Sequence, residues 1–161
     1  MTPGRARSPH LHRGVTQALG LHSDYGAEGR VITQAIDPGT LPVEMQRHLL
    51  GLKVLGGVYK QLDAPFGEFG HDSELVSTRA TASESTDDAV YRGFDEQLET
   101  CAGHREAVAG QINRLLNGVE FEGAHVSDWA LLALSIQGEE LIGQMHLLSG
   151  LSQPPAFQVC G

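Results

Sequence analysis

The fold is decided by residues 91–115, which read YRGFDEQLETCAGHREAVAGQINRL, and by residues 131–148, which read LLALSIQGEELIGQMHLL. Side chains that suit a helix interface recur there at steps of three and four. They are Tyr91, Phe94, Leu98, Cys101, Arg105, Val108, Ile112 and Leu115, and then Leu131, Leu134, Gly138, Leu141, Met145 and Leu148. Such steps place side chains on one stripe of an α-helix. Two striped helices joined by a short connection are expected to form an antiparallel hairpin, because neither can bury its stripe alone.

A further helix is predicted upstream, over Pro42–Leu62. Its apolar side chains follow the same spacing, at Met45, Leu49, Leu52, Leu55, Tyr59 and Leu62. The Asp63–Pro65 segment is expected to end this helix. Residues 66–83 are expected to form a loop, with a short extended piece at Leu75–Thr78. The predicted fold class is therefore mainly α: an antiparallel helical hairpin plus one further helix, which is an incomplete three-helix bundle.

The ends of the hairpin helices carry recognisable signals. The first helix is expected to run to Asn117, with Gly118 in the left-handed position that closes a helix. Ser127 is expected to cap the second helix, because a serine hydroxyl can accept a hydrogen bond from a free amide of the first turn.

The hairpin register predicts how the two stripes face each other. We expect a shared core or interface made by Phe94, Leu98, Val108, Ile112, Leu134, Leu141 and Met145. In this register Arg105 lies opposite Leu141 and close to Gly138. We therefore predict that Gly138 leaves room for the Arg105 stem, and that the guanidinium reaches Glu139, Glu140 or solvent.

Three segments are expected along the chain. Residues 1–28 are predicted to be a poorly ordered N-terminal segment, residues 29–150 a helical domain, and residues 151–161 a tail. Within the domain, Arg30–Ile36 alternates weakly and is read as a short strand or an extended loop. The cysteines are Cys101, on the stripe, and Cys160, in the tail. A disulfide between them is possible but requires the tail to fold back, and two cysteines alone do not indicate the redox compartment.

Composition narrows the classes of partner. The chain of 161 residues has 20 Asp and Glu against 11 Lys and Arg, a formal net charge of −9. This balance argues against nucleic acid, whose binding draws on clustered cations. It favours a solvated acidic face, or a docking surface for a basic partner. The apolar run Trp129–Gln137 is too short to cross a bilayer. With no secretory apolar region at the start, a cytoplasmic protein is expected, unless the chain is a fragment of a secreted protein.

Chemical motifs are sparse. The eight histidines show no His-Glu-x-x-His spacing, and no paired cysteine motif, phosphate loop or nucleophile elbow occurs. We expect no cofactor and no metal. The segment with the most chemical character is 64–73, where Glu68, His71, Asp72 and Ser73 lie close together. It is read either as a site or as a turn in which Asp72 bonds nearby backbone amides.

The segment Phe69-Gly-His-Asp72, read on through Leu75–Thr78 into the long helix, resembles the C-terminal tail of some bacterial alkaline-phosphatase-family phosphoesterases. There a Phe-Gly-His-Asp segment and a Ser/Thr-rich loop precede a helical hairpin. The resemblance covers roughly residues 59–150. It implies an accessory helical part of such a protein, because the family's metal ligands and nucleophile lie in a large α/β domain. No catalytic residue of the family matches a position here.

Three functional hypotheses follow. The first is a non-catalytic helical interaction or accessory module with a protein partner, or with a second copy that covers the incomplete bundle. The alternative is a phosphoesterase fragment with a site near His71 and Asp72. The third is a small-molecule or metal sensor, whose ligand lies between helices near His48, His104 or His146.

Overall fold

The computed structural model describes residues 37–64, 66–82 and 88–160. The described residues are mainly helical and contain no strand, so the predicted mainly α class is confirmed. None of the described helices is long and apolar enough to span a membrane. The segment 1–28, predicted to be poorly ordered, and the strand considered at Arg30–Ile36 lie outside the described residues.

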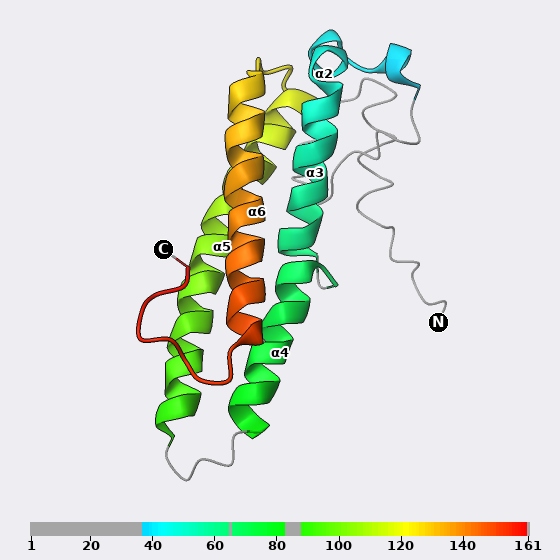
Figure 1. Cartoon of the computed structure of the whole chain (residues 1–161). Helices are drawn as coiled ribbons and strands as arrows, with labels where there is room; N and C mark the ends of the chain where they lie inside the picture. Colours follow the sequence, from blue (N-terminus) through cyan, green and yellow to red (C-terminus); the bar gives the residue numbers. More distant parts are fainter. Residues whose placement is uncertain (1–36, 65, 83–87, 161) are drawn as a thin grey trace, which may run out of the picture.

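The helices form a bundle whose arms run along one axis (Figure 1). The elements are η2 (Pro38–Thr40), α2 (Val43–Arg47), α3 (Leu49–Asp63), α4 (Glu68–Ala82), α5 (Ala89–Phe121) and α6 (Asp128–Gly150). In Figure 1, α3 and α4 follow one another as the two halves of one broken arm. Helix α5 returns in the opposite direction, and α6 again runs alongside α3 and α4. Helices α5 and α6 pack against each other, and both pack against α3 and α4.

Helix α4 corrects the prediction that residues 66–83 form a loop, and with it the extended piece at Leu75–Thr78. Its buried side chains are Phe69, Asp72, Val76 and Ala80, which again follow steps of three and four. The stripe includes an aspartate and is flanked by polar residues, so its apolar signal is weak in the sequence. Packing against α5 and α6 supplies the stability that local propensity lacks.

The predicted Pro42–Leu62 helix is divided in two. Helix α2 ends at Arg47, and α3 begins at Leu49, with His48 between them at φ −110° and ψ 18°. Helix α3 ends at Asp63, close to the predicted end.

Both hairpin helices are present as predicted, but the first of them ends later than expected. Helix α5 continues past Asn117 to Phe121, so the predicted stop at Gly118 was wrong. The Gly118 carbonyl instead accepts the amides of Glu122 at 3.1 Å and Ala124 at 2.9 Å, and Gly123 takes the left-handed conformation with φ 64°. The Ser127 cap is confirmed, because its hydroxyl accepts from the Ala130 amide at 3.2 Å.

The predicted core positions take part in the interior. Phe94, Ile112, Leu141 and Met145 are buried, whereas Leu98, Val108 and Leu134 are partly buried and pack against the buried cluster. Every residue in that list therefore contributes to the core of this chain.

The predicted pairing of Arg105 with Gly138 was wrong. A Cβ on Gly138 would collide with Val58 and press on Leu62, so Gly138 faces α3 and not α5. The Arg105 guanidinium lies over the Phe69 ring of α4, 5.8 Å from its centroid, and 3.9 Å from a Glu106 carboxylate oxygen. The prediction treated the hairpin as two helices alone. With α4 present, an aromatic face is available to a partly exposed cation.

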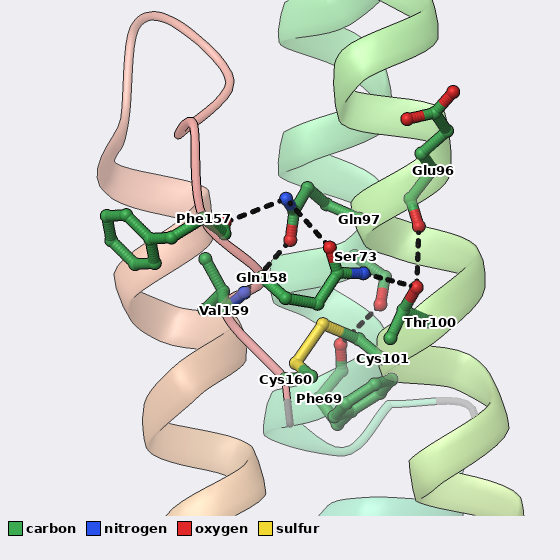
Figure 2. The surroundings of a disulfide bond; sticks show 10 residues. All are labelled: Phe69, Ser73, Glu96, Gln97, Thr100, Cys101, Phe157, Gln158, Val159 and Cys160. Atoms are coloured by element: carbon green, nitrogen blue, oxygen red, sulfur yellow. Dashed lines mark hydrogen bonds between the residues drawn. A yellow bond between two sulfur atoms is a disulfide. The ribbon is translucent and has the colours of Figure 1, made fainter.

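The tail folds back on α5 and is joined to it by a disulfide between Cys101 and Cys160 (Figure 2). Both cysteines are fully buried, and Val159 beside them is also buried. Gln97 binds the tail backbone twice. Its amide nitrogen donates to the Phe157 carbonyl at 3.0 Å, and its oxygen accepts from the Val159 amide at 3.0 Å.

The disulfide should contribute strongly to stability. We expect Cys160→Ser to lower the free energy of unfolding by about 2–4 kcal/mol, because the crosslink spans 59 residues and restricts the unfolded chain. Urea unfolding followed by circular dichroism measures this. A reducing agent should destabilise the wild type and leave Cys160→Ser unchanged. Equal stability of the oxidised wild type and the variant would contradict the prediction.

Candidate functional site

A hollow of about 490 Å³, lined mainly by polar residues, lies between α4 and the end of α6. Its lining residues are Glu68, His71, Asp72, Leu75, Arg79, His146, Ser149 and Gly150. The structure thus places Glu68, His71 and Asp72 at one hollow, because positions three and four apart share one side of helix α4. His146, Ser149 and Arg79 join them from positions for which the sequence gives no spacing signal.

Asp72 is the centre of this hollow's hydrogen bonding. It is 5% exposed, and its two carboxylate oxygens lie 3.1 Å from His146 Nδ1 and 3.3 Å from the Ser149 hydroxyl. The Arg79 guanidinium donates to the Ser149 carbonyl, near the end of α6. These contacts tie α4 to the last turn of α6, where helix carbonyls otherwise lack partners.

This arrangement is poorly suited to nucleophilic catalysis. A serine nucleophile needs a base within hydrogen-bond reach, with an orienting group behind the base. Here the carboxylate of Asp72 lies between Ser149 and His146, so the order of the groups differs. Ser149 also donates to the His146 carbonyl of its own helix, at 2.8 Å. The geometry favours a structural tie.

A second polar cluster lies at the other end of α6. Glu44 is 3.1 Å from His125 Nδ1 and 3.6 Å from His48 Nε2, and it accepts from the Val126 amide at 3.4 Å. His48 Nδ1 is 2.7 Å from an Asp128 carboxylate oxygen. The hydrogen bond from His125 holds the pKa of Glu44 below its usual value, helped by the Val126 amide and opposed by desolvation. The cluster joins the α2–α3 junction to the loop before α6.

The histidines considered for a sensor do not form one site. His48 contacts Asp128 at the start of α6, whereas His146 contacts Asp72 near its end. His104 is exposed on α5. Over residues 37–64, 66–82 and 88–160, no three His, Cys, Asp or Glu side chains come together in a way that could hold a metal ion.

The outer sides of α3 and α6 carry large apolar side chains that face solvent. On α3 these are Leu50 (79% exposed) and Val54 (51%). On α6 they are Trp129 (75%), Leu132 (51%) and Ile136 (53%). We call these five residues the α3–α6 face. Their spacing of three or four residues places each set on one stripe of its helix.

The α3–α6 face was not predicted from the sequence, although part of its signal is visible there. Residues 129–136 read WALLALSI, which is apolar on more than one side of a helix. A helix with so wide an apolar surface needs more cover than one stripe provides. The contribution of Leu50 and Val54 depends on how α3 sits beside α6, and the sequence carries no signal for that.

Comparison with known proteins found no relative of this chain: no family model, no curated protein and no solved structure matches it.

The polar tie at Asp72 should be structural. We expect Asp72→Ala to lower the free energy of unfolding by about 1–3 kcal/mol, because it removes the acceptor that joins α4 to Ser149 and His146. Urea unfolding measures the loss. Glu74→Ala is the matched control, since Glu74 is an exposed acid on the same helix. A similar effect of both changes would contradict the structural role.

Proposed function

We propose that this chain is a non-catalytic helical module that binds a protein through the α3–α6 face. The observation that carries the proposal is the exposure of Leu50, Val54, Trp129, Leu132 and Ile136 on adjacent helices. Apolar side chains gathered on one face of a folded protein mark interaction surfaces more often than scattered ones do. Trp129 is the single tryptophan of the chain, and tryptophan is enriched among residues that dominate binding energy.

The accessory role suggested by the phosphoesterase resemblance is a separate part of the proposal. The resemblance implies a Ser/Thr-rich loop before the hairpin, whereas residues 68–82 form helix α4. The interaction role is therefore argued from the α3–α6 face, and the relation to a phosphoesterase rests only on the Phe69–Asp72 segment.

The compartment is also a matter of proposal. The sequence predicts a cytoplasmic protein, but the buried Cys101–Cys160 disulfide favours an oxidising compartment, where such bonds form and persist.

Site-specific photocrosslinking tests the interaction role. A photoreactive residue at Leu132, in cells that naturally produce the chain, should crosslink to one protein species of defined mass. The same residue at Leu147 is the control, because Leu147 is 54% exposed on α6 but lies about four turns from Leu132. Equal crosslinking at both positions, or at neither, would contradict the proposal.

A phosphoesterase is retained as a second candidate because His71 and Asp72 line a hollow together with Arg79 and His146. An arginine and two histidines are groups that can bind phosphate. The position of Asp72 between Ser149 and His146 counts against a nucleophilic serine, so this candidate ranks below the interaction module.

Hydrolysis of p-nitrophenyl phosphate separates the two candidates. For an interaction module we expect no turnover above buffer, with or without added Mg²⁺ or Zn²⁺. Metal-dependent turnover that is lost in His71→Ala but kept in His104→Ala would favour the phosphoesterase instead. His104 serves as the control because it is exposed on α5 and lies outside the hollow.

A further inference from the structure

We propose that the partner at the α3–α6 face is a second copy of this chain, related by a two-fold axis that runs parallel to the bundle. This inference rests on the proposed interaction role and names its partner. It starts from the way in which α3 and α6 lie side by side.

The two helices run parallel and in a defined register. The position of Gly51 on α3 lies against Leu131, and the position of Gly138 on α6 lies against Val58. Both contacts pair a residue of α3 with the residue eighty positions later. Figure 1 shows the two helices running in the same direction over this length. Each residue of α3 therefore lies at the same height along the bundle as the residue of α6 that is eighty positions later. We call this height the level of a residue.

The upper level of both helices is apolar on the outside. Leu50 and Val54 correspond in level to residues 130 and 134, which lie among Trp129, Leu132 and Ile136. At the level below, Lys60 on α3 corresponds to Glu140 on α6. The outer surface is thus apolar on both helices at one level and oppositely charged at the next.

The cations of this surface lie on α3. Helix α3 carries Lys53 and Lys60, the only lysines of the chain, and ends at the acid Asp63, whereas α6 has no Lys or Arg and carries Asp128, Glu139 and Glu140. Lys60, Glu139 and Glu140 are exposed. Among the residues that the structure describes, no ion pair involves Lys60, Glu139 or Glu140. These charges are therefore available to a partner.

A two-fold axis parallel to the helices satisfies both levels at once. It places α3 of one copy beside α6 of the other without changing the levels. Leu50 and Val54 then meet Trp129, Leu132 and Ile136 of the second copy, and Lys60 meets its Glu140. Because the interface is two-fold, every contact occurs twice.

An axis perpendicular to the bundle fits less well. It reverses the order of levels. An axis that crosses the apolar level keeps apolar side chains in contact, but it moves Lys60 of one copy away from Glu140 of the other. The level order therefore selects the parallel arrangement.

The composition of the surface is also suitable. A standard interface buries roughly 800 Å² on each partner, with an apolar centre and a polar rim. The five residues of the α3–α6 face form such a centre, and Lys60 with Glu139 and Glu140 forms part of a rim. The formal charge of −9 on each copy opposes association elsewhere, so the cations of α3 give this face its local complementarity.

Charge exchange tests the arrangement, with sedimentation equilibrium of the purified full chain as the readout. We expect a dimer for the wild type. Lys60→Glu and Glu140→Lys should each raise the dissociation constant roughly three- to tenfold, because each introduces two like-charge contacts. The double variant Lys60→Glu with Glu140→Lys should restore the wild-type constant. Circular dichroism verifies that each variant is folded.

An apolar variant gives a second test. Ile136→Glu should abolish the dimer, whereas Leu147→Glu, also exposed on α6, should retain it. Failure of the double charge exchange to restore association would overturn the parallel arrangement, and a dimer that tolerates Ile136→Glu would overturn the α3–α6 face as its interface. A monomer at every concentration would overturn the second copy as partner. The interaction role would then still be decided by crosslinking at Leu132.

Discussion

The structure depends on the close contact between α3 and α6 at Gly138. Because Gly138 has no side chain, Val58 and Leu62 of α3 approach the backbone of α6 in the space that a Cβ would fill. This contact sets the register of two parallel helices that are far apart in the sequence. The register in turn brings Glu44 and His48 to the start of α6, and α4, which follows α3, to its end. The polar ties at both ends of α6 are therefore consequences of one packing constraint.

The sequence was sufficient for the stripes that are mainly apolar. Phe94, Ile112, Leu141 and Met145 were predicted as core from spacing alone and are buried. Helix α4 was missed because its stripe passes through Asp72, whose burial is favourable only once His146 and Ser149 are beside it. The error at Arg105 follows from missing α4, because the Phe69 ring beneath the Arg105 guanidinium belongs to that helix.

At the candidate site, too, some residues could be predicted from the sequence and others could not. Closeness in sequence was enough to group Glu68, His71 and Asp72, although their segment was expected to be a loop and forms helix α4. Their partners His146 and Ser149 lie more than seventy residues away and could not be found without the fold. The α3–α6 face could be predicted from the sequence only in part. The apolar excess of residues 129–136 is visible in the sequence, but the exposed side of α3 emerges only from packing.

The distribution of ties around the bundle indicates which side is open to a partner. Pro154 packs on Gly93, so closely that a Cβ at Gly93 would collide with it. Further along α5, Gln97 and Cys101 bind the tail through hydrogen bonds and the disulfide (Figure 2). The tail therefore covers this side of α5 within the same chain. The outer sides of α3 and α6 have no such cover among the described residues, yet they present large apolar side chains. A covalently held tail on α5 and an apolar α3–α6 face together favour association through α3 and α6.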